Sequence, residues 1–591
     1  MSAGRLRIES VGGLGEMGHH HMVVDVGDDS FLVDCGMLFA PASDPGVDRI
    51  LPSFEPARQR AADGRLRGLL LTHGHLDHLG AVPDLLAALP GLPVYATSWA
   101  LALLRRRLDR GDAPRTAPLE ARLVTPGETI TIGDTEATWL RVTHSLPEAC
   151  SLALRGEAGT VVHSGDFRIQ EDPLLGPPTD LAGLRAIGDG GVDLALVDST
   201  SSAKPGRTLS EREVAQRLAE VAREATGAVV VTSFSSHVER MYACLLAARA
   251  SGRRLAIYGR SAEETARLAI ERGLLPVEAG ELLPIDFLED QPKDKLLALV
   301  TGSQGEFRAP LARIARQQDS RLSLGPGDLV VWSARVIPGG ERTVGALLNR
   351  FVEAGVRVIP PWGKDAVGLH TSGHGQAEEV AEWLDCVRPR RVLPIHGEPW
   401  HLVRHRDVLR GRLADDRVLS LRSGQILKLD VAEDTVEITD APHPQTWIAL
   451  GGQAFPQGDR ALSTRRKAGT LGAATVTVPW HDGKVAGRPV VHCLGLAPLE
   501  ETPALERSLA DAIWQRLADA APQRDTAAAT ETARLVLRSE VRKVVGTKPP
   551  CTAALLPLDG VVSCDDIVAN PEPEPAHGAD RDPTAPREDP P

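Results

Sequence analysis

Histidines cluster in one short stretch of this chain, from Leu69 to Gly80, and this stretch constrains the fold more than any other. An apolar run that is typical of a buried strand ends there, and four potential metal ligands follow within six residues: His73, His75, Asp77 and His78. Alternate residues of an extended backbone share a face, so the first two imidazoles point together while the other two side chains reach a second position nearby. Histidine is only 18 of 591 residues, so a chance cluster of this kind is rare. The motif predicts a site for two metal ions, with zinc expected and manganese as an alternative.

Polar residues also follow the ends of several other predicted strands. These residues are Asp34, His144, Asp166, Asp198 and His396. Because α/β folds place their chemistry just past the C-terminal ends of buried strands, these residues are candidates for the same site. The segment His370 to Gly375 precedes a predicted helix over 376–387, whose N-terminal amides, with the Ser372 hydroxyl, favour a phosphate in that turn. The consecutive histidines His19 to His21 are not expected to share a metal, because neighbours on a strand point to opposite faces.

The chain divides into four predicted parts. Strand and helix patterns alternate over residues 1–208 and resume over 360–445, and the run of strand–helix units over 209–359 predicts a self-contained α/β domain between them. Residues 446–568 alternate more weakly, contain two Ala-rich helical stretches, and indicate a small α+β domain. From residue 569 on, the sequence is Pro, Asp and Glu with little apolar content, which predicts a disordered tail.

Composition excludes several classes of protein. The formal net charge of −13 argues against a protein that coats nucleic acid by bulk attraction, although it leaves room for a local basic channel. Seven cysteines without a C-x-x-C pair fit a reducing compartment better than a disulfide framework. No apolar run approaches the roughly 18 residues that a membrane span needs, and no signal-peptide pattern opens the sequence. We therefore expect a cytoplasmic protein that does not associate with membranes.

Taken together, the candidate residues resemble the set found in metallo-β-lactamase-fold hydrolases, and Asp198, His374 and His396 resemble the further motifs of the β-CASP nucleases. The closer resemblance is to bacterial ribonuclease J, and it extends over nearly the whole chain. Its landmarks here include Gly12 to Gly18, the His73 motif, Gly259-Arg260-Ser261, Thr301 to Glu306, Ile337-Pro338-Gly339, His370 to His374 and His396-Gly397-Glu398. The resemblance implies a discontinuous metallo-β-lactamase αββα sandwich (1–208 and 360–445), an inserted α/β β-CASP domain (209–359) and a small C-terminal α+β domain (446–568).

The resemblance also implies a role for each candidate residue. One divalent metal would be held by His73, His75 and His144, and the other by Asp77, His78 and His396. Asp166 would bridge the two ions, and Asp34 would orient ligands from outside the coordination sphere. The catalytic residues would be His374, which serves the leaving 3′ oxygen, Asp198, which holds it, and Asp77. The 5′ phosphate of the substrate would lie against Ser236, His370, Ser372, Gly373 and His374.

The function that this resemblance implies is hydrolysis of single-stranded RNA by two metal ions, as a 5′→3′ exoribonuclease with endoribonuclease activity, in mRNA decay and rRNA maturation. The expected partners are RNA, further copies of the chain in a homodimer or homotetramer, and other RNA-decay proteins. A β-CASP nuclease acting on DNA remains open, because nothing in the sequence shows contacts to 2′-hydroxyls. A small-substrate hydrolase of the same fold would not need the inserted domain, and a non-catalytic RNA-binding assembly subunit would be expected to have lost ligands.

Several positions depart from the family pattern, such as Gly340 in place of an asparagine and Phe307 in place of a proline, and so do two segments. Ser236-His237-Val238-Glu239-Arg240 stands where the family usually has Ser-Asn-Ile-His-Arg, so an acid occupies the usual histidine position of the predicted phosphate pocket. His19 to His21 replace a Lys-Asn pair. None of these departures changes a predicted metal ligand, so hydrolysis is expected to survive.

Overall fold

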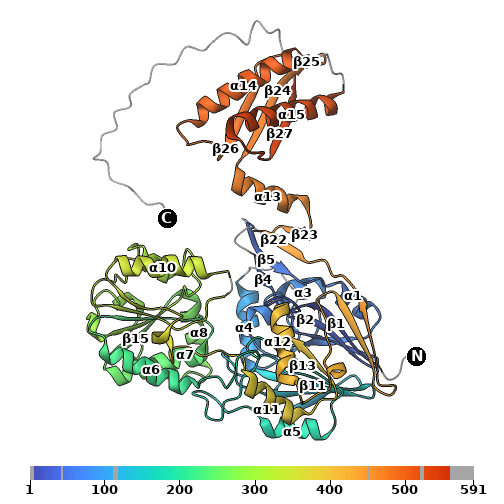
Figure 1. Cartoon of the computed structure of the whole chain (residues 1–591), viewed down its shortest axis with the longest axis vertical. Helices are drawn as coiled ribbons and strands as arrows, with labels where there is room; N and C mark the ends of the chain where they lie inside the picture. Colours follow the sequence, from blue (N-terminus) through green and yellow to red (C-terminus); the bar gives the residue numbers. More distant parts are fainter. Residues whose placement is uncertain are drawn as a thin grey trace, which may run out of the picture. The chain divides into compact units, whose positions relative to one another are not determined.

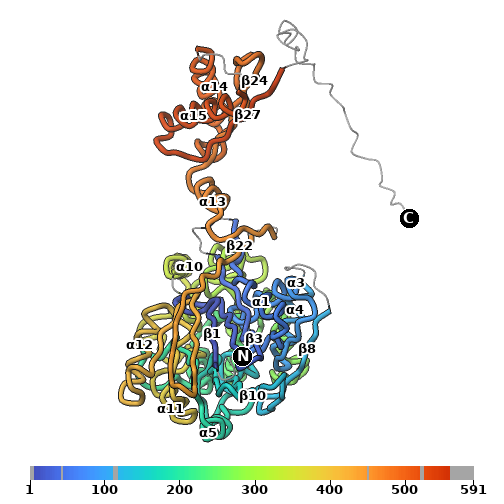
Figure 2. The backbone as a smooth tube through the Cα atoms, turned by 90° about the vertical axis from the view of Figure 1, so that its right-hand side faces the viewer, coloured from blue at the N-terminus to red at the C-terminus, as the bar shows by residue number. Residues whose placement is uncertain are grey.

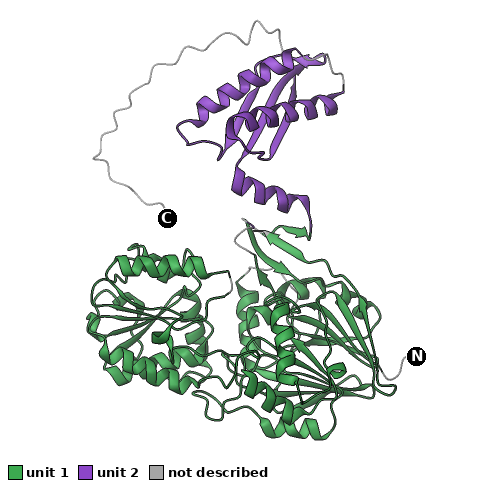
Figure 3. Cartoon of the chain, viewed as in Figure 1, with its two compact units in different colours: residues 1–41, 46–457 green, residues 42–45, 458–591 purple. Residues whose placement is uncertain are grey.

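The computed structural model describes residues 5–40, 44, 46–110, 118–337, 339–449, 452–519 and 525–558. The chain forms two compact units, residues 1–41 with 46–457 and residues 42–45 with 458–591, and Figure 3 shows each in its own colour. The predicted disordered tail from residue 569 lies outside the described residues. No helix within the described ranges is long and apolar enough to cross a membrane.

Two sheets that face each other form the centre of the first unit (Figure 1). The first sheet has the strand order β21 (Thr435–Asp440), β20 (Gln425–Asp430), β1 (Arg5–Gly12), β2 (His21–Val26), β3 (Asp29–Val33), β6 (Leu66–Leu70), β7 (Val94–Ala96) and β8 (Ala121–Leu123). The second has the order β19 (Val392–Ile395), β13 (Leu194–Asp198), β12 (Gly159–His163), β11 (Cys150–Gly156), β10 (Thr135–Arg141) and β9 (Thr129–Ile132). Apolar side chains from both sheets, such as Phe31 and Trp139, share one buried core, which explains why the two sheets stack.

Helices cover the outer face of each sheet. The first sheet packs against α3 (Val82–Ala88) and α4 (Ser98–Asp109), where Leu85 and Trp99 join the core cluster of Leu69. The second sheet packs against α5 (Leu181–Asp189) and α11 (Ala377–Val387), where Leu184 and Trp383 are fully buried. The predicted αββα sandwich is therefore confirmed, because each sheet buries one face on the other sheet and one face under helices.

The predicted inserted α/β domain is also present. All its strands are parallel, in the order β15 (Arg254–Tyr258), β16 (Leu296–Val300), β14 (Val229–Thr232), β17 (Leu329–Trp332) and β18 (Arg357–Ile359). Such strands are buried on both faces, as their nearly continuous apolar sequence requires. One face is covered by α6 (Glu211–Glu224), α7 (Val238–Ser251) and α8 (Arg260–Glu271), and the other by α9 (Pro310–Ala315) and α10 (Glu341–Glu353) (Figure 1).

The second unit is a small α+β structure. Its sheet consists of β25 (Lys484–Val485), β24 (Ala473–His481), β26 (Val490–Leu494) and β27 (Cys551–Pro557), which pairs with β24 in parallel. Helices α14 (Thr502–Ala518) and α15 (Thr526–Val545) lie side by side against this sheet, as Figures 1 and 2 both show. A third helix, α13 (Arg460–Leu471), begins the unit after Gln457.

The boundary before this unit differs from the predicted one. The sequence predicts a domain from residue 446, whereas residues 446–456 belong to the first unit. The reason is strand pairing, since β22 (Thr446–Ala449) lies between β5 (Val47–Leu51) and β23 (Ala454–Pro456) in a small sheet that β4 (Leu38–Phe39) completes. This pairing joins residues about 400 positions apart, so no local pattern reveals it.

Candidate metal centre

Asp34 organises the stretch that carries the clustered histidines. It follows β3, and its carboxylate accepts hydrogen bonds from the backbone N–H of Thr72 (2.8 Å) and from the Thr72 hydroxyl (2.7 Å). The same carboxylate accepts a third bond from Nδ1 of His78, also at 2.7 Å. These contacts tie the end of β3 to the loop after β6 and to α2 (Leu76–Leu79), the short helix that carries Asp77 and His78.

The first group of ligands lies on this loop and at the end of β10. Nδ1 of His75 is 3.0 Å from Nε2 of His73 and 3.1 Å from Nε2 of His144. One nitrogen atom cannot form good hydrogen bonds to two other ring nitrogens at once, whereas a cation can bind all three. Nitrogen ligands bound at about 2.0–2.1 Å to one zinc ion are separated by about the distances seen here. The structure therefore brings together the three histidines that the sequence predicts for one metal.

The second group contains the predicted ligands Asp77, His78 and His396, the last of which follows β19, together with His20. Oδ2 of Asp77 lies 3.7 Å from Nε2 of His396 and 3.8 Å from Nε2 of His78. The Nε2 atoms of both histidines are buried and make no hydrogen bond. Unpartnered buried nitrogens that converge on a carboxylate fit a bound cation.

One carboxylate oxygen of Asp166 lies between the two groups. Oδ2 of Asp166 is 3.2 Å from Nε2 of His78 and 3.2 Å from Nε2 of His396. The same oxygen is 3.7 Å from Nε2 of His73 and 3.9 Å from Nε2 of His144. This is the position that a bridging ligand requires. Asp166 reaches it because it follows β12, which lies between β13 and β11 in the second sheet.

The remaining ring nitrogens fix the orientation of the histidines. Nδ1 of His144 donates to the carbonyl oxygen of Gly373 (2.8 Å), and Nδ1 of His396 donates to the Thr200 hydroxyl (2.6 Å). Nδ1 of His73 likewise lies 3.0 Å from the Thr72 hydroxyl. Partners of this kind select the tautomer that leaves Nε2 free for a metal.

Burial and charge set the protonation of the centre without metal. Burial lowers the pKa of His75 to about 4 and holds the pKa values of His73 and His144 well below the ordinary value, so the first group is neutral at pH 7. Burial also disfavours the charged forms of His78 and His396, but neighbouring carboxylates, Asp166 first among them, outweigh it. They hold the pKa of His78 well above the ordinary value and raise the pKa of His396 to about 10. The second group therefore holds two protons that a metal ion would displace.

A candidate proton-transfer pair lies beside the second group. His374 precedes α11, and its Nδ1 donates to Oδ2 of Asp198 at 2.8 Å. Asp198 ends β13, and its other oxygen accepts the backbone N–H of Thr200 (2.9 Å). Burial would raise the pKa of Asp198, but the neighbouring His374 and His396 hold it below the ordinary value, so this carboxylate stays ionised.

Comparison with known proteins agrees with this geometry. Residues 14–215 match the metallo-beta-lactamase superfamily, residues 226–351 match the family "Ribonuclease J, beta-CASP domain", and residues 367–418 match the family "Zn-dependent metallo-hydrolase RNA specificity domain". Ribonuclease J of Mycolicibacterium smegmatis is 34% identical over 512 residues, which are 86% of this chain and 89% of that protein. Ribonuclease J of Sinorhizobium meliloti is 34% identical over 556 residues, which are 92% of this chain and 95% of that protein. The chain belongs to the ribonuclease J family.

Membership of the ribonuclease J family makes the chain a metal-dependent ribonuclease, and the His and Asp groups give it candidate divalent-metal sites. A solved structure titled "Crystal Structure of a Protein of Unknown Function from Enterococcus faecalis V583" is also similar in fold, with a TM-score of 0.50 and 16% identity. It covers 72% of this chain and 100% of its own chain.

The predicted phosphate turn of this ribonuclease J family member lies directly against the first ligand group. The carbonyl oxygen of Gly373 accepts the bond from His144, and a Cβ atom on Gly373 would lie 2.7 Å from Cε1 of that ring. The Ser372 hydroxyl accepts the backbone N–H of His374 (3.1 Å), which shapes the turn. His370 is held nearby with an unpartnered, buried Nδ1 atom. Ser236 lies in the turn between β14 and α7.

The structure shows where the altered segment of the inserted domain points. Glu239 is buried, its Oε2 accepts a bond from Arg168 (2.6 Å), and its Oε1 accepts the backbone N–H groups of Leu174 and Leu175. Arg168 in turn donates to the carbonyl oxygen of Ser372 at 3.4 Å. Glu239 therefore supports the phosphate turn through Arg168, and both its oxygens are occupied away from that turn.

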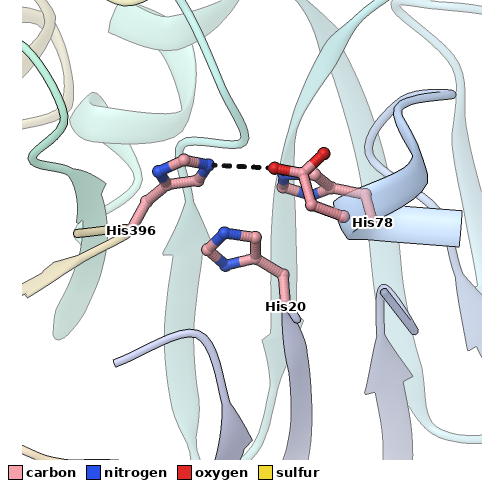
Figure 4. Close-up of side chains that lie close together, drawn as sticks. His20, His78 and His396 are labelled. Carbon is pink, nitrogen blue, oxygen red and sulfur yellow. Dashed lines mark ion pairs between the residues drawn. The ribbon is translucent and has the colours of Figure 1, made fainter. Parts of the chain in front are cut away.

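The sequence analysis missed one residue of the second ligand group, His20. Figure 4 shows its ring beside those of His78 and His396. The sequence predicts that three consecutive histidines do not share a metal site, and the contacts of His19 and His21 agree with this. Nδ1 of His19 faces Glu16, and Nδ1 of His21 donates to the carbonyl oxygen of Asp34. The alternation of side chains that separates these neighbours is what leaves His20 alone to reach the cluster.

Proposed function

We propose that this chain degrades single-stranded RNA from the 5′ end and also cuts it internally, in mRNA decay and rRNA maturation. One observation carries the proposal: the phosphate turn, the candidate proton-transfer pair and both ligand groups form one continuous site. The turn is joined to the first group by the bond from His144 to Gly373 and to the second by the adjacent His374. A terminal phosphate in this turn would lie next to the reacting bond, which favours removal of one nucleotide at a time.

In this proposal His73, His75 and His144 hold one divalent cation, and Asp77, His78 and His396 hold the other, with Asp166 shared. The donor set of imidazoles and carboxylates suits zinc, and manganese is the alternative. When bound, the two cations supply an activated water as nucleophile and neutralise charge on the scissile phosphate.

The chain's own residues would complete the reaction. His374 is oriented by Asp198 so that its Nε2 edge faces away from the carboxylate and can give a proton or a hydrogen bond to the leaving 3′ oxygen. The carboxylate of Asp198 stays ionised, so it keeps accepting from Nδ1 and holds the ring in the orientation that this role needs. Asp34 would keep His78 and Thr72 in place throughout, since it bonds to both.

The 5′ phosphate is assigned to Ser372, Gly373, His370 and Ser236, beside His374. Support comes from the unpartnered, buried Nδ1 of His370. The predicted amides at the start of α11 do not contribute, because the N–H groups of Gly375, Ala377 and Glu378 already donate to backbone carbonyl oxygens. We further propose a homodimer or homotetramer, with other RNA-decay proteins as partners. The cytoplasm is the proposed place of action, because the six cysteines among the described residues are all free thiols.

The deciding experiment is a time course on one RNA prepared with a 5′ monophosphate, triphosphate or hydroxyl, in the presence of zinc or manganese. We expect mononucleotides to be released fastest from the monophosphorylated RNA. The His78→Ala variant should lose about 100-fold or more of this activity, since loss even of a residue that only orients a ligand typically costs 10–100-fold.

A matched control is Asp172→Ala, which changes an exposed carboxylate that pairs with Arg212 and should leave cleavage unchanged. Internal fragments that do not depend on the 5′ end would contradict the exonuclease part of the proposal. Cleavage of DNA but not of RNA would contradict the choice of substrate.

A further inference from the structure

His20 lies in the second ligand group with a fixed backbone. It immediately precedes β2, and its backbone N–H donates to the carbonyl oxygen of Asp77 at 2.9 Å. Its own carbonyl oxygen accepts the backbone N–H of Gly36 at 2.8 Å. Gly13, at φ +88°, packs against the ring so closely that a Cβ atom there would lie 2.5 Å from Nδ1 of His20. His20 is 3% exposed, so neither its main chain nor its ring has room to move.

The ring of His20 stacks on two imidazoles of the group. Its centroid lies 4.0 Å from that of His396, with 14° between the ring planes, and 4.4 Å from that of His78, with 18° between the planes. The two outer rings are themselves 5.6 Å apart and inclined by only 17°. The single ring of His20 therefore lies at stacking distance from both of its neighbours, and Figure 4 shows the three rings together.

Stacking and coordination place different demands on an imidazole. An imidazole binds a metal through a lone pair in its own plane, so His78 and His396 can share an ion that lies close to both of their nearly parallel planes. The ring of His20 is inclined by only 14° and 18° to these two rings, at centroid distances typical of stacked rings. Its Nε2 atom is buried without a hydrogen bond, and one of its ring nitrogens lies within 4.8 Å of the ligand atoms of the group, so the test must separate stacking from coordination.

We propose that His20 is a positioning residue that stacks on His78 and His396 and holds their ring planes in the orientation that binds the second metal ion. This inference rests on the two-metal site proposed above. Residues that only orient metal ligands typically contribute 10–100-fold to affinity or activity, which sets the size of the expected effect.

The test compares variants that keep the ring with variants that keep a polar atom. His20→Phe retains an aromatic face but has no nitrogen, whereas His20→Asn retains a potential oxygen or nitrogen donor but has no ring. His19→Asn is the matched control, since His19 is equally buried, lies next in the chain and faces Glu16. Full-length proteins stripped of metal are titrated with Co²⁺, with calorimetry for each affinity and visible absorption for the ligand field.

If His20 acts by stacking, His20→Asn should lower the affinity for the second Co²⁺ ion about ten-fold or more and leave the affinity for the first ion unchanged. In His20→Phe and His19→Asn, the affinity for the second ion should stay within about three-fold of the wild-type value. A second-ion affinity that falls more in His20→Phe than in His20→Asn would show that His20 is a ligand and would overturn the proposal. Equal affinities in all proteins, or equal weakening in the His19→Asn control, would also overturn it.

Two further readouts keep the outcome clear. Melting of the metal-free proteins shows whether each variant folds. If His20→Phe does not fold, the cobalt absorption of His20→Asn at saturation decides, because a stacking residue leaves the number of nitrogen ligands and the absorption intensity unchanged, and a changed intensity would refute stacking. A wild-type protein that binds only one ion would contradict the two-metal proposal itself, and a wild type that binds two would keep that proposal whatever the His20 variants do.

Discussion

Asp34 and His396, on opposite sides of the metal centre, both adopt a positive φ of 56°, a backbone conformation that costs a non-glycine residue free energy. Such residues persist only where several partners hold them. Asp34 accepts three hydrogen bonds through its carboxylate, and His396 is held by the Thr200 hydroxyl through both its ring and its carbonyl oxygen. The strain at single residues is thus offset by the bonds that orient the ligands.

The two ligand groups should respond differently to pH. His75, with a pKa of about 4, is neutral above pH 5, so the affinity of the first group should be nearly constant from pH 6 to 9. His396, with a pKa of about 10, and His78, whose pKa lies well above the ordinary value, must each release a proton, so the affinity of the second group should rise up to about 100-fold per pH unit over this range. Titration of Co²⁺ at several pH values, in buffers of different ionisation enthalpy, measures both slopes and the released protons. Equal slopes for the two ions would contradict the assignment.

Asp198→Asn removes the charged acceptor that orients His374. We expect kcat for RNA cleavage to fall about 100-fold, the lower part of the range for lost acid–base catalysis, with the metal content unchanged. Steady-state kinetics with metal analysis checks this, and Asp172→Asn on the exposed surface is the control. Loss of bound metal in Asp198→Asn would instead place Asp198 among the ligands.

The strands of the sandwich bring the candidate residues together, because several strands end at the same edge, next to the site. The loops after β3, β6, β10, β12, β13 and β19 each bring a candidate residue to the same edge of the sandwich. The turn before α11 adds the proposed phosphate site, and it can approach the first ligand group only because Gly373 has no side chain. Close packing at this turn therefore links substrate binding to metal binding.

Gly373→Ala tests that link. The new methyl group would come within 2.7 Å of the His144 ring, so it should displace the imidazole. We expect the affinity for the first metal ion to fall about ten-fold and the rate of RNA cleavage to fall at least as much. Metal titration and the RNA time course measure both effects. Gly345→Ala in α10 is the matched control, since nothing lies within 4 Å of its added Cβ. Because alanine favours the helix over glycine, this variant should be more stable by about 1 kcal/mol. Normal metal affinity in Gly373→Ala would rule out the predicted contact.

The molecule as a whole consists of two compact units, and the first carries every candidate residue of the site. The unit boundary lies after Gln457 because β22 completes the sheet around β5. Ile448 and Phe455, both buried, supply the apolar contacts of this pairing. A catalytic unit cut before these residues would lose part of its own core.

Two truncations separate assembly from folding. A chain that ends at Gln457 should keep the melting temperature of the first unit but lose self-association, which the resemblance to ribonuclease J places partly in the second unit. A chain that ends at Gln445 should in addition lose about 3 kcal/mol of stability, because it no longer buries Ile448 and Phe455. Light scattering and thermal unfolding measure the two effects. An unchanged oligomer in the Gln457 chain would refute the assembly role of the second unit.

The sequence by itself determined the alternation of strands and helices, the inserted domain and the candidate ligands, because the period of apolar residues sets each strand and a His-x-His-x-Asp-His run is rare by chance. The αββα class followed from the resemblance of these residues to those of metallo-β-lactamase-fold hydrolases. Only the tertiary structure decided which nitrogens converge, that Glu239 turns toward Arg168, and that His20 stacks on two ligands. The boundary at Gln457 also depends on pairing between distant strands. These features are set by contacts across long separations in sequence, and no local pattern encodes the direction in which a buried side chain finally points.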